Sequence, residues 1–460
     1  MTISRLAASV RAGGASAVEL VGRSLERIAA RDGELHAVVA LRAEEGLAEA
    51  RAADANGHIG TLAGLPLLVK DTEDVAGMRT THGSAVHADA APAAADSLVV
   101  ARLRAAGAIV VGKTNVPEFA FEGYTNNELF GATLNPWAPQ WSPGGSSGGS
   151  AAALAAGLAP LVTATDGGGS IRIPAAFCGL AGLKPTNGLI GRSPMPSWID
   201  LSTSGPLATN VTDLALLLEV LKGPVAGDPN AHPAWSPRMG VWPRRALVAP
   251  RLAPTAPLPP AIAASFETAV LAFARASGLM PEEADLRPLF AVGDMDDDWF
   301  TICAVEELHA FGRENLRTHR DRLSPVFRTI MEMAAGIELD AYLDAKRRRF
   351  GYVRAVDELL GRDAVLLTPT MCVEGFPADG RMHGADHAGT PAEAYNTQLA
   401  NVTGHPALSL PAGVSANGVP FGLQIMGPRF ADDLVLTVGA TWEASAPWPQ
   451  VAPGYESFTV

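Results

Sequence analysis

Cysteine is scarce in this sequence: Cys178, Cys303 and Cys372 are spread over 460 positions without a Cys-x-x-Cys pair. An odd and widely spaced set predicts neither a disulfide framework nor a zinc site. We therefore expect free thiols in a reducing, cytoplasmic compartment, with Cys178 a small buried residue.

Long hydrophobic runs are also missing. No stretch approaches the ~18 uninterrupted apolar residues of a membrane-spanning helix, and residues 1–16 lack the apolar core of a signal peptide.

Basic residues are fewer than acidic ones, with 35 Lys and Arg against 48 Asp and Glu and a net charge of −13. Such a surface repels polyanions, which argues against nucleic acid and membranes as partners and favours a small molecule.

Lysine is rare even among the basic residues, since 30 of the 35 are arginine. In this background each lysine raises the question of what arginine could not do in its place. Lys70 directly follows the apolar run LPLLV at 65–69, which predicts a short buried strand. Desolvation at the end of such a strand disfavours the ammonium and lowers its pKa from about 10.4 towards the range of a useful base.

Helices and buried strands alternate along the chain. A capping box formed by Ser16 and Glu19 begins a helix predicted over 17–31. The apolar patterns predict further helices over 43–54, 97–106, 212–222, 260–277 and 431–444, and strands over 108–111, 158–165, 365–368, 406–411 and 421–426. Alternation of this kind indicates an α/β fold with a sheet covered by helices. Neither a linker nor an internal repeat divides the chain, so we expect one domain over residues 1–460.

The region 285–350 is the most polar part of the chain and reads as irregular. It contains an acidic run, Asp294, Asp296, Asp297 and Asp298, that resembles a calcium loop. The glycine that such a loop needs is missing, and Val305 at its twelfth position cannot supply a bidentate carboxylate. We predict a solvated acidic turn and no metal site.

Two short motifs have conflicting surroundings. Residues 107–114, GAIVVGKT, match the pattern of a nucleotide-binding loop. However, the variable residues are themselves a predicted strand, so phosphate binding at Lys113 is not expected. Residues 145–149, GSSGG, match the nucleophile elbow of α/β-hydrolases, but the preceding Pro143 and Gly144 do not form a buried strand. Ser147 is therefore read as a structural hydrogen bonder.

Three separated segments together suggest nucleophilic catalysis. They are Lys70, the run GGSSGG at 144–149, and the run TDGGGSIRIP at 165–174. A serine nucleophile needs a base, which a desolvated lysine provides. Three glycines before Ser170 allow successive backbone N–H groups to converge beside the hydroxyl and hold an oxyanion.

At these residues the sequence resembles the amidase signature family. The resemblance is densest over 142–186, SPGGSSGGSAAALAAGLAPLVTATDGGGSIRIPAAFCGLAGLKPT, and extends over roughly 15–230 and 360–445. It includes LPLLVKD, GAIVVGKTNVPEFA, TLNPW, GPLATNVTDLALLLEVLKG, NVTGHPALSLPAG and GLQIMG. The part between about 230 and 360 resembles nothing that we can place.

The resemblance implies a role for each residue of the three segments. Ser170 would be the nucleophile, Ser146 the bridging serine, usually preceded by a cis peptide, and Lys70 the acid/base. The oxyanion hole would use the N–H groups of Gly167, Gly168 and Gly169 together with that of Ser170, and the loop would be braced by Asp166 and Arg172. Family members often carry another residue at the position of Gly167. Gly167 still provides a backbone N–H for the oxyanion hole.

The family implies a single large, mixed, twisted β-sheet with helices on both faces. We expect an N-terminal helical layer over 1–60, a catalytic core over 60–230, a variable substrate-side region over 230–360 and the remainder of the core over 360–460. Three aromatic residues could line an apolar acyl pocket or belong to the hydrophobic core: Trp198, Trp299 and Phe300. His82 and His405 read as structural or pocket-lining.

The expected activity is hydrolysis of a small-molecule carboxylic amide through a Ser170 acyl-enzyme, with no metal and no organic cofactor. A homodimer is the default for the oligomeric state. One alternative is the glutamine-hydrolysing A-type component of a tRNA-dependent amidotransferase, which shares these motifs. That component typically carries a Gly-Ser-Ser-Thr-Glu-Asn-like run where this chain has FEGYTNN at 121–127, which favours a stand-alone amidase. A non-catalytic binding protein is the third reading.

Overall fold

The computed structural model describes residues 1–57, 60–233, 241–253, 257–381 and 394–460. The fold is α/β, as predicted. Each predicted helix lies within three residues of an observed one at both ends, and α2 (Ala17–Arg31) carries the predicted capping box. No described helix combines the length and apolar character needed to cross a membrane.

The strands form hydrogen-bonded sheets that are separate from one another, so the prediction of one sheet is not confirmed. The first has the order β1 (Val38–Leu41), β3 (Ile109–Thr114), β2 (Pro66–Lys70) and β4 (Leu161–Val162). The second has the order β10 (Glu282–Glu283), β9 (Arg245–Val248), β11 (Ala364–Pro369), β13 (Pro420–Met426), β12 (Ala407–Val414), β6 (Ala181–Lys184) and β8 (Leu207–Ala208). A third sheet pairs β5 (Thr165–Asp166) with β7 (Thr203–Ser204). The first two sheets adjoin where β4 contacts β8.

Helices cover both faces of the larger sheet, as predicted. Because side chains alternate along a strand, successive residues of β11 enter different cores. Val365 packs in one core with α8 (Pro260–Ser277) and α15 (Asp432–Ser445). Leu366 packs in the opposite core with α13 (Leu339–Leu360). The remaining helices are α1 (Ile3–Arg11), α3 (Ala43–Asn56), α4 (Leu98–Ala105), α5 (Gly148–Ala155), α6 (Arg172–Cys178), α7 (Val211–Leu221), α9 (Arg287–Phe290), α10 (Met295–Phe311), α11 (Arg313–Thr318), α12 (Pro325–Ala335) and α14 (Gln398–Thr403).

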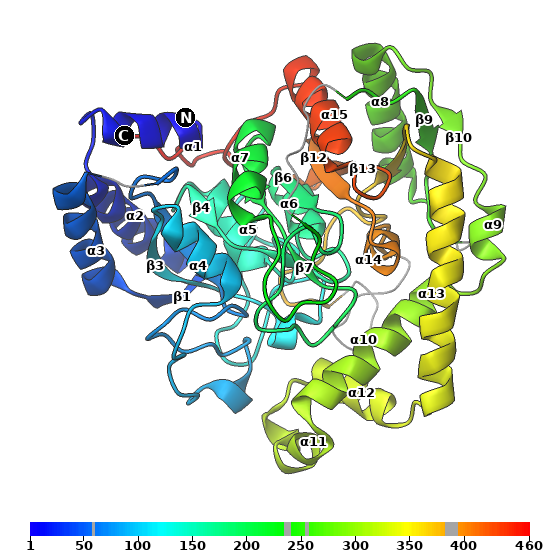
Figure 1. Ribbon diagram of the computed structural model, residues 1–460, viewed down its shortest axis with the longest axis horizontal. Coiled ribbons are helices and arrows are strands. Elements are labelled where there is room, and N and C mark those ends of the chain that lie inside the picture. The colour runs from blue at the N-terminus through cyan, green and yellow to red at the C-terminus, as the bar shows by residue number, and fades with distance from the viewer. Residues whose placement is uncertain (58–59, 234–240, 254–256, 382–393) are drawn as a thin grey trace.

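The prediction that residues 285–350 are irregular is wrong. This region forms α9 to α12 and half of α13, and Figure 1 shows α10 to α13 together on the right-hand side of the molecule. The acidic run is the start of α10, where the Asp294 side chain caps the helix by accepting from the N–H groups of Asp296 and Asp297. Asp298 is buried against Arg348 and Tyr352 of α13, so it is not solvated either. Carboxylates at this end of α10 are stabilised by its dipole.

The strand predicted over 158–165 is much shorter than expected. β4 consists of two residues, and the chain then turns towards β5. Just after β4, the Thr163 hydroxyl accepts a hydrogen bond from the backbone N–H of Lys70 at 2.8 Å. This turn carries the following glycine loop to the end of β2, where Lys70 lies.

Candidate active site

Lys70 is the last residue of β2, an interior strand between β3 and β4, and its side chain is fully buried. Its Nζ donates to three hydroxyl oxygens, those of Ser146 at 2.7 Å, Ser147 at 3.0 Å and Thr165 at 2.8 Å. Burial lowers the pKa of Lys70 to about 7, against the opposing charges of Glu73 and Asp166. The ammonium and the free amine are therefore both populated near neutral pH.

Ser146 and Ser147 lie immediately before α5. The peptide bond between Gly145 and Ser146 is cis, as the resemblance implied. The Ser147 N–H donates to the backbone oxygen of Ser170 at 3.3 Å, which holds the two serine-containing loops side by side. The Ser147 hydroxyl also accepts from the N–H of Thr165 at 3.4 Å, which agrees with its reading as a structural hydrogen bonder.

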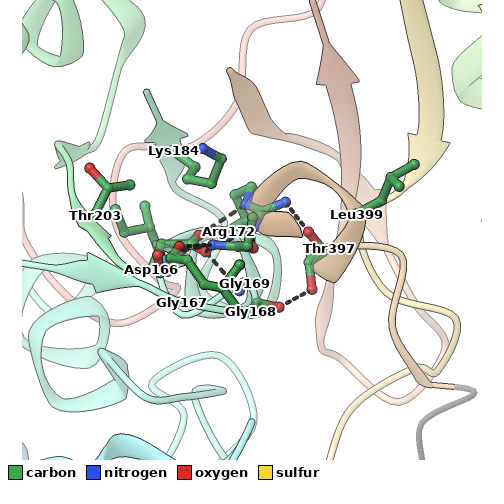
Figure 2. A network of polar contacts seen from close by, with 12 residues as sticks. Asp166, Gly167, Gly168, Gly169, Arg172, Lys184, Thr203, Thr397 and Leu399 are labelled. Atoms are coloured by element: carbon green, nitrogen blue, oxygen red, sulfur yellow. Dashed lines mark hydrogen bonds and ion pairs between the residues drawn. The ribbon is translucent and has the colours of Figure 1, made fainter. Parts of the chain in front are cut away.

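The loop that carries Ser170 is held by a buried ion pair between Asp166 and Arg172 (Figure 2). The guanidinium donates to both carboxylate oxygens, at 2.9 and 2.8 Å. The same carboxylate accepts the N–H groups of Gly169 at 2.7 Å and Ile171 at 3.2 Å. Burial alone raises the pKa of Asp166, but the charge and hydrogen bonds of Arg172 outweigh it and lower that pKa to about 2.

Arg172 is held in turn by residues that the sequence did not single out. Its remaining N–H groups donate to the backbone oxygen of Thr397 at 2.7 Å, to Gln424 at 2.8 Å and to Asn401 at 2.6 Å. The Thr397 hydroxyl donates to the backbone oxygen of Gly168 at 2.5 Å, a contact that Figure 2 also shows. More than 220 residues separate Thr397 from Gly168 in the chain, so no local signal could have revealed them as partners.

The predicted set of oxyanion-hole donors needs one correction. The N–H of Gly169 is already engaged by the Asp166 carboxylate, so it is not free for an oxyanion. Within the described ranges, the N–H groups of Gly167, Gly168 and Ser170 have no protein acceptor. Asp166 thus orients the turn through Gly169 and leaves the other donors of the loop available.

Two indole rings explain why the loop begins with glycines. A Cβ on Gly167 would lie 2.4 Å from ring atom Cε3 of Trp198, and one on Gly168 would lie 2.5 Å from Cζ2 of Trp299. The Trp299 indole N–H also donates to the backbone oxygen of Gly167 at 3.0 Å. The two rings meet edge to face, with centroids 5.7 Å apart. Close packing by the tryptophans therefore requires the unsubstituted backbone at Gly167.

Two cavities meet at Ser170 and Trp198. The smaller, of about 230 Å³, is bordered by Ser146 and Thr165 and by Glu73, Ser97 and Glu307. The larger, of about 1140 Å³, is bordered by aromatic and apolar side chains, including Phe121, Trp299, Phe300, Phe327, Ile330, Met333 and Tyr395, and also by acidic ones, including Glu122, Asp297 and Asp379. Ser170 is thus accessible from both sides, whereas Ser146 borders only the smaller cavity.

Comparisons with known proteins show which family the chain belongs to. The sequence model of the Amidase family matches residues 19–436. The chain belongs to the amidase family. Its sequence is 31% identical to an acylamidase of Rhodococcus erythropolis over 98% of this chain and 97% of that protein. It is also 32% identical to the A-type component of the glutamyl-tRNA(Gln) amidotransferase of Chromohalobacter salexigens, over 99% of this chain and 98% of that protein.

Solved structures give the same assignment. A bacterial aryl acylamidase of the amidase signature family superimposes with a TM-score of 0.89 and 28% identity, over 97% of this chain and 96% of the other. The protein is therefore an amidase.

The competing motifs have structural roles in this amidase. Lys113 lies inside β3, fully buried, with its Nζ 2.8 Å from Asp71, so residues 107–114 form no phosphate loop. Residues 142–144, before the GSSGG run, lie outside any strand, so the elbow geometry is not formed.

Of the two histidines singled out from the sequence, one lines a cavity and the other is buried. His82 borders the smaller cavity and stacks on Phe119, and burial lowers its pKa to about 4. His405 is buried, with Nδ1 2.9 Å from the Thr403 hydroxyl. All three cysteines are free and buried, and Cys178 is confirmed as a small buried residue.

Proposed function

We propose that this amidase hydrolyses small-molecule carboxylic amides through an acyl-enzyme on Ser170. The observation that carries the proposal is the 2.7 Å contact between Lys70 Nζ and Ser146 Oγ, since Ser146 and Ser170 border the same cavity. Neutral Lys70 accepts a proton from Ser146, which takes one from Ser170. The Ser170 oxygen attacks the carbonyl carbon.

The oxyanion formed in this step accepts hydrogen bonds from the N–H groups of Gly167, Gly168 and Ser170. The proton returns through Ser146 to the leaving nitrogen, and the C–N bond breaks. Water then repeats the sequence on the ester of Ser170 and releases the acid. The steps use neither a metal nor an organic cofactor.

We propose further that the larger cavity takes the acyl group. Its aromatic and apolar lining suits an apolar acyl chain or ring. Phe300, Phe327 and Met333 belong to α10 and α12, which supports the assignment of residues 230–360 as the substrate-side region. Trp198, at the junction of the two cavities, would contact the scissile group.

The glutamine-hydrolysing component of an amidotransferase is the competing function, because such a component is among the similar proteins. FEGYTNN at 121–127 stands where these components typically carry a Gly-Ser-Ser-Thr-Glu-Asn-like run, which favours the stand-alone enzyme.

The cytoplasmic location and the homodimer stay predictions. Light scattering tests the homodimer.

The decisive experiment is an assay of the purified chain on a panel of aliphatic, aryl and urea-type amides together with glutamine. Turnover of simple amides by the chain alone, with covalent labelling of Ser170 by a fluorophosphonate, is the expected result. Activity that is confined to glutamine and requires a co-purified partner would instead assign the amidotransferase function.

A further inference from the structure

The smaller cavity contains polar atoms that the mechanism above does not use. Glu73, Thr72 and Ser97 border this cavity, and each has a buried side-chain oxygen, Glu73 Oε2, Thr72 Oγ1 and Ser97 Oγ, without a hydrogen-bond partner within the described part of the chain. Glu73 is 7% exposed, so its free carboxyl oxygen has little access to bulk water. A buried oxygen without a partner is costly unless a ligand or water completes its hydrogen bonds.

We propose that the smaller cavity binds the amine half of the substrate and that Glu73 accepts a hydrogen bond from its N–H group. The proposal rests on the amide hydrolysis proposed above and names the residue that recognises the leaving group. It makes Glu73 a specificity-determining residue that acts on the substrate and not on the nucleophile.

The position of the proton relay decides which half of the substrate lies on which side. The leaving nitrogen must receive its proton from Ser146, so it must lie on the side of Ser170 where Ser146 is accessible. Ser146 and Thr165 border the smaller cavity and not the larger one. The amine half therefore points into the smaller cavity, and the acyl half is left with the larger, aromatic one.

Contacts within the fold place the Glu73 carboxyl next to this relay. The Ser204 hydroxyl donates to Glu73 Oε1 at 3.3 Å. Ser204 of β7 pairs with Thr165 of β5, whose hydroxyl accepts from Lys70 Nζ at 2.8 Å. One carboxyl oxygen is thus held by Ser204, and the other has no hydrogen-bond partner among the described residues. In either protonation state the carboxyl keeps an oxygen that can accept from N–H.

The cavity also limits the amine. About 230 Å³, bordered by hydroxyls and two carboxyls together with apolar side chains such as Leu98 and Met195, suits ammonia or a small amine. A second carboxyl, Glu307, borders the same cavity near Ser197 and Trp198, and burial raises its pKa to about 7. Glu307 is the alternative acceptor, and the experiment must distinguish it from Glu73.

The test compares the primary amide and the methyl ester of one acyl group, the one cleaved fastest in the panel. The ester has the same acyl half but no N–H on its leaving group. For Glu73→Met, which removes both acceptor oxygens whereas glutamine would keep one, we expect the ratio of amide to ester kcat/KM to fall about ten- to a hundredfold relative to wild type. Glu26→Met, which removes an exposed carboxylate from α2, is the matched control and should leave the ratio unchanged.

Equal losses on the amide and the ester would overturn the proposal, because Glu73 would then not act on the leaving group. A fall in the ratio together with a shifted pH profile of kcat/KM would also overturn it, because Glu73 would then act through the charge of Lys70. A fall confined to Glu307→Met would overturn it in favour of that carboxyl. An enzyme without amide turnover and without labelling at Ser170 would instead refute the proposed function itself.

A second measurement uses only the wild-type enzyme and does not depend on a variant that folds. Methylamine added during ester cleavage attacks the acyl-enzyme: its nitrogen bonds to the acyl carbon, the bond to Ser170 Oγ breaks, and one amine proton passes through Ser146 back to Ser170. Formation of the N-methyl amide should saturate with methylamine, because the amine binds before it reacts. A strictly linear dependence up to inhibitory concentrations would contradict an amine site.

Discussion

The indole ring of Trp198 lies against the backbone of Gly167, so closely that a Cβ at position 167 would come within 2.4 Å of ring atom Cε3. The backbone at Gly167 is not in the left-handed region, and the ring alone excludes a side chain there. The contact joins the loop with the proposed oxyanion-hole donors to Trp198, which borders both cavities.

Gly167→Ala should therefore lower kcat/KM by displacing the loop or the ring, and overpacking of this kind costs about 1 to 3 kcal/mol of stability. In a Trp198→Leu background the same substitution should cost less, because the obstructing ring is gone. Steady-state kinetics and thermal unfolding of the four proteins measure this coupling. Gly22→Ala, a helical glycine with open space around it, is the control. An equal cost in both backgrounds would contradict the assigned role of the ring.

Ser170→Ala should abolish labelling by a serine-directed fluorophosphonate, whereas Ser147→Ala should not. The loops of the two serines are joined by a hydrogen bond, and the Ser147 hydroxyl is 3.0 Å from Lys70 Nζ, so this control is demanding. The difference is that the free backbone N–H donors belong to the loop of Ser170. Mass spectrometry of the labelled peptide is the measurement. Retained labelling in Ser170→Ala with loss in Ser147→Ala would reassign the nucleophile.

The sequence predicted the elements around the site because short runs of neighbouring residues determine them. An apolar run that ends in Lys70 indicates a buried strand, and consecutive glycines before Ser170 indicate a backbone turn. The same reasoning failed over 285–350, because the polar residues there have distant partners. Asp298 looks like a solvated carboxylate until α13 brings Arg348 to within 2.5 Å of it.

Long-range pairing also explains why half of the loop support was missed. Asp166 and Arg172 are six residues apart and were predicted as a brace from the resemblance, but Asn401 and Gln424 come from the far end of the chain. Amide side chains in an ordinary helix or strand give no sign of such a role. Glu73 is a similar case, since only the folded cavity shows that one of its oxygens has no partner.

Arg172→Met should destabilise the protein by about 3 to 5 kcal/mol, because it leaves the carboxylate of Asp166 buried without its counter-ion. Denaturant unfolding measures this, and kcat/KM should fall as well, since the ion pair orients the loop of Ser170. Arg317→Met, which breaks the exposed pair with Glu314, is the control and should change neither quantity appreciably.

The folded-state pKa of Asp166 is depressed to about 2. Its stabilising contribution is therefore complete above its ordinary pKa and lost as the pH falls towards 2.

ATP and magnesium should change neither the amidase activity nor the melting temperature. Lys113 is buried in β3 beside Asp71, where phosphates cannot reach converging N–H groups. A ligand at a hundredfold excess over its Kd would stabilise the folded state by about 2.7 kcal/mol, which calorimetry detects readily. A saturable rise in melting temperature with ATP would refute this reading of residues 107–114.

The pH profile and the Lys70→Arg variant show whether Lys70 acts as a buried base or as a structural ammonium. If neutral Lys70 starts the relay, kcat/KM should rise with pH through an apparent pKa near that of the lysine, about 7, and then reach a plateau. The direction follows from the role of the amine, because only the free amine accepts a proton and that form grows as the pH rises. Burial lowers the pKa and so moves this rise to about pH 7. Lys70→Arg keeps the charge but cannot lose a proton, so it should lose activity almost as fully as Lys70→Ala, by a factor on the order of 10² to 10⁴. The hydrogen bonds of Lys70 Nζ among the described residues are to the hydroxyls of Ser146, Ser147 and Thr165. If Lys70 served only as the positive partner of a carboxylate, arginine would substitute for it and most of the activity would remain. An arginine variant that kept about half of the wild-type rate with an unchanged pH profile would rule out the lysine as base, even if amide hydrolysis itself were confirmed.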